Sequence, residues 1–297
     1  MKKLLALLLA LGMMAGVLAG CGAEGSSAEA ETSAPAVESA KDNTTPAENN
    51  NSAAEPAAAS GDKTWVIATD TVFKPFEYTD ETGAFVGIDV DIVAAIAEDQ
   101  GFNYELQSLG WDSAIAACQA GQADGMIAGA SITDERKENG WVFSDGYYTA
   151  TQCMAVAESS DIAGFGDLNG QTVAVKTGTQ GASYAESLQE ENGFEIIYFE
   201  DSPTMYQAVA GGQAVACFED TPIMAASIKD GGLGLKIVEG SENEGAPYGF
   251  AVFASESEDS SSEPTVKSQE LLDMFNAGLK NIQENGKYDE IIAKYLG

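Results

Sequence analysis

Short segments rich in β-branched residues alternate with helical segments of about ten residues, and this alternation starts twice along the chain. The first series runs from residue 65 to 128 and the second from 171 to 218. Strands are expected at 65–69, 104–107, 124–128, 171–175, 195–199 and 214–218. Helices are expected at 112–120, 181–191 and 204–211, and a further helix is expected to begin with Asp89 as its N-cap. Such alternation is typical of parallel sheets, so the sequence predicts an α/β fold. Its 297 residues are enough for two compact domains.

Acidic side chains outnumber basic ones by 47 to 14, and the sequence contains no histidine. The formal charge of −33 argues against nucleic acid as a partner, because phosphate binding needs a basic surface. Without imidazole there is neither a Ser-His-Asp triad nor a histidine-ligated metal site. The four cysteines form no CxxC motif. An extracytoplasmic location would allow a Cys153–Cys217 disulfide, although buried free thiols are the simpler expectation.

The first 20 residues have the pattern of a signal peptide. Two lysines precede an apolar run from 4 to 19, which is too short for a comfortable transmembrane helix. The run ends in LAGC, which resembles the bacterial lipobox, so Cys21 is expected to carry a lipid. Residues 22–61 are rich in alanine, serine and asparagine and lack aromatic residues. They bury too little apolar surface to fold, so residues 21–61 are expected to form a lipid-anchored disordered tether of about 35 Å.

Six short motifs follow one another between residues 62 and 297. They are ATDTVFKPFEY at 68–78, GIDVD at 87–91, GASITDER at 129–136, FSDGYY at 143–148, VKTGT at 175–179 and EDTP at 219–222. In this order and at this spacing, the chain closely resembles the polar amino-acid-binding proteins of bacterial ABC importers, the family 3 solute-binding proteins with glutamine-binding-like lipoproteins among them. One such motif would carry little weight, whereas six in sequence cover nearly the whole folded part.

The resemblance implies a two-lobed fold of the periplasmic-binding-protein type II, in which the chain crosses twice between the lobes. Matching the motifs puts the crossings near 146–150 and 244–248, so lobe one is 62–147 plus 249–297 and lobe two is 151–245. The ligand would be a polar L-amino acid, held in the cleft and delivered to a membrane permease. The family implies neither a metal nor an organic cofactor and no catalysis. We expect an extracytoplasmic monomer anchored through Cys21.

The head group of an amino acid presents a carboxylate and an ammonium. Arg136 follows Thr133, an expected N-cap, and a guanidinium can hold a carboxylate through two parallel hydrogen bonds. Backbone N–H groups from Gly129 to Ser131 and the Ser131 hydroxyl are expected to help bind the carboxylate. The resemblance places Asp70 and Asp220 on the ammonium, one from each lobe.

The remaining site residues are expected to surround the ligand's side chain. The resemblance places Phe73 and Trp111 on either side of its aliphatic stem, and Lys176 and Glu219 where the family varies with substrate. The glycine-rich turn from Lys176 to Gly181, which includes Thr179 and Gln180, offers N–H groups at a helix N-terminus but is no nucleotide-binding P-loop. For Lys176 and Glu219, a salt bridge away from the cleft remains open.

One cation and one anion left for the side chain suit a glutamine-type amide, which both donates and accepts hydrogen bonds. The sequence therefore ranks glutamine or a similar neutral polar amino acid first, basic amino acids or cystine second and glutamate third. A dehydratase-like enzyme on the same fold is the alternative function, with Glu219 as its acid. A receptor sensor domain would need a transmembrane helix and an intracellular module, which the sequence does not predict.

Overall fold

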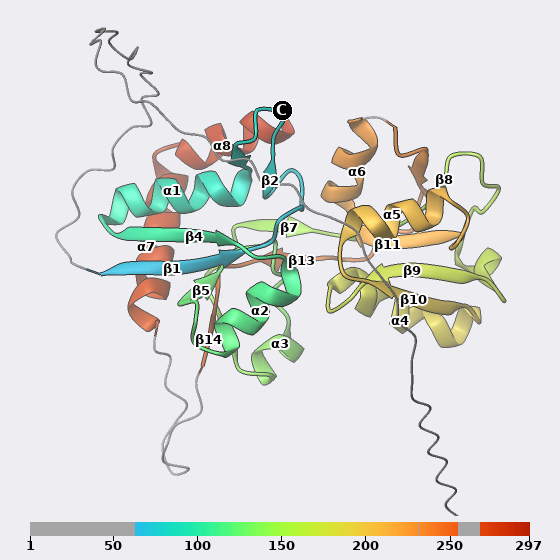
Figure 1. Cartoon of the computed structure of the whole chain (residues 1–297), viewed down its shortest axis with the longest axis horizontal. Coiled ribbons are helices and arrows are strands. Elements are labelled where there is room, and N and C mark those ends of the chain that lie inside the picture. The colour runs from blue at the N-terminus through green and yellow to red at the C-terminus, as the bar shows by residue number, and fades with distance from the viewer. Residues whose placement is uncertain (1–62, 231, 255–267) are drawn as a thin grey trace, which may run out of the picture. The chain divides into compact units, whose positions relative to one another are not determined.

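Two five-stranded mixed sheets form the centre of the structure, a computed structural model that describes residues 63–230, 232–254 and 268–297. The expected signal peptide, Cys21 and the expected tether lie outside these residues. We call the elements around the first sheet the first lobe and those around the second sheet the second lobe (Figure 1). Among the described residues, no helix is long and apolar enough to cross a membrane.

The first sheet has the strand order β4-β1-β5-β14-β6, with β1 parallel to β4 and β5 and with β14 antiparallel to β5 and β6. Its strands are β1 (Thr64–Thr69), β4 (Asn103–Ser108), β5 (Gly125–Met126), β6 (Trp141–Phe143) and β14 (Ala251–Phe253). The helices of this lobe are α1 (Ile88–Gln100), α2 (Trp111–Gln119), α3 (Asp134–Glu138), α7 (Gln269–Glu284) and α8 (Lys287–Leu296), and a short hairpin joins β2 (Tyr78–Thr79) to β3 (Phe85–Val86). The sheet thus draws β14 from a segment more than a hundred residues beyond β6.

Alternate residues of β1 pack into two different cores, because successive side chains of a strand point to opposite faces. Trp65 and Ile67 lie in the core shared with α1, α7 and α8. Ala68 lies in the core on the other face, with Val66 packed against it, and α2 supplies Trp111 to that core. Both faces of β1 are therefore covered, as expected for a parallel strand.

The second sheet repeats this arrangement with the order β10-β9-β11-β8-β12. Its strands are β8 (Gln152–Ala157), β9 (Thr172–Lys176), β10 (Glu195–Phe199), β11 (Ala216–Asp220) and β12 (Leu235–Ile237), and its helices are α4 (Gln180–Asn192), α5 (Ser202–Ala210), α6 (Thr221–Lys229) and the short 3-10 helix η1 (Phe165–Leu168). The parallel strands β10, β9 and β11 lie between α4 on one face and α5 on the other (Figure 1). This topology bears out the α/β expectation.

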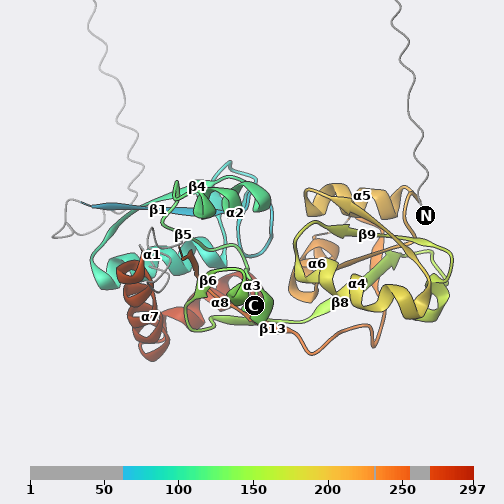
Figure 2. The ribbon, with the colours of Figure 1, turned by 90° about the horizontal axis from the view of Figure 1, so that it is seen from below.

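A two-stranded antiparallel ladder of β7 (Tyr148–Ala150) and β13 (Ala246–Tyr248) lies where the chain passes between the lobes. Figure 2 shows the two segments running next to each other between the lobes. The ladder overlaps the ranges expected for the two crossings. Gly245 approaches the Ala150 carbonyl so closely that a Cβ would lie 2.4 Å from its oxygen, and its φ of +73° also favours glycine.

Local sequence signals placed most elements within a few residues, but the role expected for Asp89 is wrong. The N-cap of α1 is Gly87, and Asp89 lies inside the first turn. Its carboxylate accepts hydrogen bonds from the Gly129 N–H and the Tyr147 hydroxyl instead of capping its own helix. Near the C-terminus, Gly286 has a φ of +83° and separates α7 from α8.

The cysteines of the second lobe are free thiols. Cys153 on β8 and Cys217 on β11 are both completely buried and form no disulfide, so the pairing considered from the sequence is absent. Burial raises the pKa of the Cys153 thiol to about 12. Both side chains lie in the apolar core beneath α5 and serve as small hydrophobic residues.

An ion pair on the outside of the molecule links the two lobes. The Lys74 ammonium, from the loop after β1, lies 2.5 Å from the Asp230 carboxylate at the end of α6. Their side chains are 38% and 49% exposed. Ile223 of α6 adds an apolar contact, because it packs into the main core of the first lobe.

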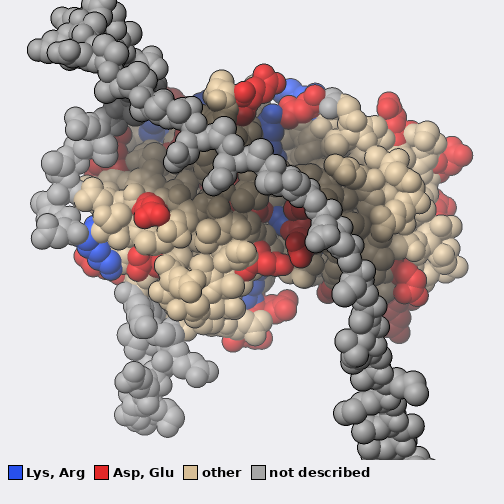
Figure 3. All heavy atoms as spheres, in the orientation of Figure 1, with Lys and Arg blue, Asp and Glu red and all other residues tan. Residues whose placement is uncertain are grey.

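Acidic side chains are spread over the visible face of both lobes (Figure 3).

We expect Lys74→Met to weaken ligand binding slightly, because the ion pair exists only while the lobes are together. An exposed pair contributes at most about 1 kcal/mol, so the dissociation constant should rise by no more than about fivefold at low salt and hardly at all in high salt. Titration calorimetry at both salt concentrations measures this. Lys137→Met, which breaks the Lys137–Asp134 pair within α3, is the matched control. Equal effects of the two variants would contradict an interlobe role for Lys74.

Candidate functional site

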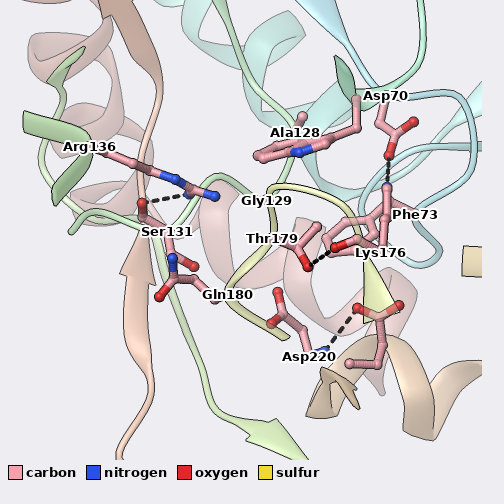
Figure 4. A pocket seen from close by; sticks show the side chains of 12 residues that line it. Asp70, Phe73, Ala128, Gly129, Ser131, Arg136, Lys176, Thr179, Gln180 and Asp220 are labelled. Carbon is pink, nitrogen blue, oxygen red and sulfur yellow. Dashed lines mark hydrogen bonds and ion pairs between the residues drawn. The ribbon is translucent and has the colours of Figure 1, made fainter. Parts of the chain in front are cut away.

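The ligand-binding residues expected from the sequence surround one cavity between the lobes. Asp70 follows β1, while Lys176 and Asp220 end β9 and β11, so the carboxyl ends of strands from both sheets face it. Ligands of open α/β sheets bind at this end of the strands. The residues that line the cavity are Asp70, Phe73, Trp111, Ala128, Gly129, Ser131, Arg136, Lys176, Thr179, Gln180, Glu219 and Asp220 (Figure 4). Ala128 is the lining residue that the sequence analysis missed.

Arg136 enters the cavity from a short helix that is capped as expected. Thr133 is the N-cap of α3, and its hydroxyl accepts a hydrogen bond from the Arg136 backbone N–H at 3.2 Å. The guanidinium donates to the Ser131 carbonyl at 2.8 Å and to the Gly178 carbonyl of the second lobe at 3.2 Å. It also stacks over the Trp111 ring, 5.2 Å from its centroid. These contacts use two of the five guanidinium N–H donors.

The surroundings of Arg136 lower its pKa from the ordinary value, because they remove water from the charged group. The negative charge of Asp220 works in the opposite direction. A desolvated guanidinium with unused donors binds a carboxylate strongly. Gly178 belongs to the VKTGT motif, but nothing in the sequence indicates that its carbonyl would meet Arg136 across the cleft.

Asp220 is held by residues of the second lobe and of the crossing segment. Gln152 donates its side-chain amide to Asp220 at 2.6 Å, and the Tyr248 hydroxyl donates to the other carboxylate oxygen. Burial, and then the charge of Glu219, raise the pKa of Asp220 to about 7. Gln152 and Tyr248 were not predicted as site residues. Their signal in the sequence is weak: Gln152 is a polar residue that opens an otherwise apolar strand.

Lys176 and Asp70 form a buried ion pair across the cleft. The Lys176 Nζ lies 2.5 Å from the Asp70 Oδ2, and both residues are less than 5% exposed. The second carboxylate oxygen accepts the Thr71 N–H at 2.6 Å. The same ammonium lies 5.3 Å from the Phe73 ring centroid and 5.8 Å from that of Trp111. Asp70, which the sequence analysis expected on the ligand's ammonium, is therefore already paired with Lys176 in this structure.

Glu219 is saturated with hydrogen bonds from its own lobe. Its Oε2 accepts the Ser202 hydroxyl at 2.6 Å and the Tyr206 hydroxyl at 2.8 Å, and its Oε1 accepts the Asp220 N–H at 2.9 Å. It is 3% exposed and lines the cavity. Glu219 therefore adds negative charge to the site but offers a ligand little free hydrogen-bonding capacity.

Trp111 contributes a free hydrogen-bond donor to the cavity lining, and Gly129 is a position where a larger residue would not fit. The Trp111 indole N–H is buried and has no hydrogen-bond partner among the described residues. Gly129 has a φ of +54°, and a Cβ there would lie 2.4 Å from the Phe73 ring. The sequence analysis expected the Gly129 N–H to help bind the ligand carboxylate. In the structure this N–H instead donates to Asp89 at 2.9 Å, so it does not face the cavity.

Thr179 and Gln180 shape the turn that faces Arg136 and Lys176. Thr179 is the N-cap of α4: its hydroxyl accepts the Ala182 N–H at 3.3 Å and donates to the Lys176 carbonyl at 2.8 Å. Gln180 is the first residue of the helix, and Figure 4 shows its side chain below Ser131. The turn thus presents a helix N-terminus to the cavity, where a carboxylate or amide oxygen is stabilised.

The two-lobed α/β fold has clear counterparts among known proteins. A model of the bacterial extracellular solute-binding proteins, family 3, matches residues 65–297. The chain belongs to this family. A probable histidine-binding protein of Neisseria gonorrhoeae is 32% identical over 246 residues, which are 82% of this chain and 87% of that protein.

Solved structures give the same result. An ancestral arginine-binding protein bound to arginine has a TM-score of 0.70, and one bound to glutamine has a TM-score of 0.69. Both are 32% identical to this chain and cover 79% of it and 98% of their own length. This family 3 chain is therefore an amino-acid-binding protein with the two-lobed fold. The relatives named here are binding proteins and not enzymes. A further similar structure, 31% identical with a TM-score of 0.66, is that of an ancestral amino acid-binding protein that is a precursor of cyclohexadienyl dehydratase.

We expect the buried Lys176–Asp70 pair to be strongly coupled in the protein without added amino acid. Lys176→Met leaves a buried carboxylate unpaired, at a cost of up to about 3–5 kcal/mol, whereas Lys176→Met with Asp70→Asn removes both charges and should lose less than the two single changes together. Urea unfolding of the four proteins gives the coupling, which should exceed about 1 kcal/mol.

A cycle on the exposed Lys280–Glu284 pair of α7 is the matched control, with coupling below about 0.5 kcal/mol. A coupling at Lys176–Asp70 as small as this control would mean that the cleft pair does not form in solution.

Proposed function

We propose that this protein captures a polar L-amino acid between its lobes and delivers it to the permease of an ABC importer. The observation that carries the proposal is the presence of Arg136 and Asp220 at one cavity, each on its own lobe. A zwitterion placed between them satisfies both with one small molecule. Because this ligand touches both lobes, its binding favours the arrangement in which they are together.

The head group is assigned by charge and by free donors. The carboxylate lies on the unused guanidinium donors of Arg136, near the N-terminus of α4, and the ammonium lies on Asp220. An ammonium next to Asp220 restores the ionised form of this carboxyl group, whose pKa is about 7 in the surroundings described here. The stem of the amino acid packs between the rings of Phe73 and Trp111, which also attract cationic groups.

Two classes of side chain compete, and each has its own observation. The buried Lys176–Asp70 pair favours a neutral amide such as that of glutamine, because the ammonium opposes a second cation near it. The names of the relatives favour a basic amino acid, since one is a probable histidine-binding protein and another is an arginine-binding protein. The structure of such a protein bound to glutamine indicates that one cleft of this kind accepts both. We rank glutamine first on the contacts of Lys176, and a basic amino acid second.

Membrane attachment is a separate part of the proposal. The LAGC motif supports a lipid on Cys21, and the composition of 22–61 supports a tether between this lipid and the lobes. An anchored binding protein remains close to its permease. Loss of membrane partitioning in Cys21→Ser is the test.

A thermal-shift screen of the protein against the twenty amino acids, cystine and ornithine tests the function directly. A ligand that binds only the folded state raises its stability by about 2.7 kcal/mol at a hundredfold excess over the dissociation constant. We expect glutamine to give the largest shift and glutamate a small one. A larger shift with arginine, lysine or histidine would replace our first choice by the second. No shift with any amino acid would overturn the proposal.

We expect Arg136→Ala to weaken every amino acid that binds the wild type, by roughly 2–5 kcal/mol, because the ligand carboxylate loses its charged partner in a desolvated cleft. Arg136→Lys should remain weak, since an ammonium cannot donate two parallel hydrogen bonds. Titration calorimetry measures both, and Lys137→Ala on the exposed side of the same helix is the control. A loss of less than a few-fold in Arg136→Ala would remove Arg136 from the site.

A further inference from the structure

Two acidic side chains lie behind the cavity and take no part in the proposed ligand contacts. Glu77 and Asp89 are both 0% exposed. Glu77 is tied to the lining residue Phe73, whose N–H donates to the Glu77 carbonyl at 2.7 Å, and Asp89 lies in the first turn of α1. The charge of Asp89 and a side-chain hydrogen bond with it both raise the pKa of Glu77, so the two carboxyl groups lie close together.

The donors around this pair are unequally shared. The Asp89 Oδ2 accepts the Gly129 N–H and the Tyr147 hydroxyl, each at 2.9 Å. Both oxygens of Glu77 and the other oxygen of Asp89 have no N–H or O–H donor among the described residues. Two carboxylates cannot hydrogen bond without a proton, because each is only an acceptor. Asp89 is stabilised as the anion by its two donors, so the proton belongs on Glu77.

Burial raises the pKa of both groups, to about 7 for Asp89 and well above the ordinary value for Glu77. The charges of Asp89 and Asp70 raise the pKa of Glu77 further, whereas Lys176 lowers it. The titratable and charged groups that face the pair from the surrounding elements are Asp70, Tyr147, Lys176 and Tyr288. Like charges at such short range in a buried site disfavour double ionisation.

We propose that Glu77 is a positioning residue for the ligand site, because it donates a shared proton to Asp89 and so fixes the loop that begins at Gly129. Asp89 holds the Gly129 N–H, and the same loop presents the Ser131 carbonyl to the Arg136 guanidinium. Through Tyr147 the pair also reaches the segment that enters the crossing ladder. A single proton therefore joins the Phe73 loop, α1, the Gly129 loop and the start of the crossing. The role in binding rests on the proposed function, while the shared proton does not.

Loss of the proton from Glu77 lowers the unfolding free energy as the pH rises. The folded protein holds it above pH 4.5, the ordinary value for a glutamate, whereas the unfolded chain releases it there. The contribution of Glu77 to the unfolding free energy is therefore largest at low pH and falls as the pH rises through the raised pKa. Above that pKa two negative charges face each other behind Gly129, and the loop loses its fixed position.

The first experiment needs no ligand. Urea unfolding of the wild type and of Glu77→Gln between pH 5 and pH 8 should show that the wild type loses stability relative to the variant as the pH rises, because glutamine donates to Asp89 without titrating. Glu98→Gln, on the exposed face of α1, should follow the wild type at every pH. Infrared difference spectra near neutral pH should show the carbonyl stretch of one more protonated carboxylic acid in the wild type than in Glu77→Gln, because the signal of Asp220 is common to both proteins. An equal pH dependence of the wild type and Glu77→Gln would overturn the shared proton, whether or not any amino acid binds.

The second experiment uses the amino acid that gives the largest thermal shift. We expect the affinity of the wild type to fall relative to that of Glu77→Gln, by about fivefold or more between pH 6 and pH 9. The titrations of the ligand ammonium and of Asp220 cancel in this ratio, since both proteins share them. Glu77→Leu, which removes the donor, should bind weakly throughout. A constant ratio, or wild-type affinity in a folded Glu77→Leu protein, would overturn the positioning role.

Discussion

A charge taken out of water must meet an opposite charge or several hydrogen-bond donors, and this requirement organises the cleft between the two lobes. Lys176 and Asp70 meet it as an ion pair at 2.5 Å. Glu219 meets it with three neutral donors of its own lobe. Asp220 has two donors and a pKa of about 7, so it is the carboxyl group of the cavity whose charge is least settled by the protein itself. In the proposed function, a ligand ammonium supplies the opposite charge that Asp220 lacks in the protein alone.

Much of the fold follows from local patterns, because strands and helices depend first on the spacing of apolar residues. The period of two in β1 divides its side chains between two cores, and the positive φ of Gly286 separates α7 from α8. The N-cap role expected for Asp89 was wrong because its hydrogen-bond partners are distant in the sequence. An aspartate at a helix start usually caps the helix, and the sequence contains no sign that Gly129 and Tyr147 will supply its donors from 40 and 58 residues away.

The candidate site shows the same division. The motifs indicated most of the side chains that surround the cavity, since five of the six motifs lie at the end of a predicted strand or at the start of a predicted helix. They could not indicate which side chains pair. Lys176 and Asp70 are 106 residues apart in the sequence and come from different sheets, so their contact depends on how the lobes meet. The partners of Asp220, Gln152 and Tyr248, come from the strands at and beside the crossing, where the sequence has no comparable motif.

Glu219 is surrounded by neutral hydrogen-bond donors, whereas Asp70 is paired with a cation, and this difference bears on which ligand side chains the site favours. With Asp70, Glu219, Asp220, Arg136 and Lys176 all ionised, the cavity holds one net negative charge, and a zwitterionic head group leaves it unchanged. Hydrogen bonds from Ser202 and Tyr206 fill the lone pairs of Glu219 without neutralising it, so its field still attracts a cation. Lys176 opposes that cation, although its own charge is paired with Asp70. Net charge alone therefore favours a basic ligand, while the position of Lys176 beside both aromatic rings favours a neutral one. In the arrangement proposed above, the stem lies between those rings, so the end of the side chain would meet Lys176 before it meets the donors around Glu219, and the lysine would determine which class of amino acid fits.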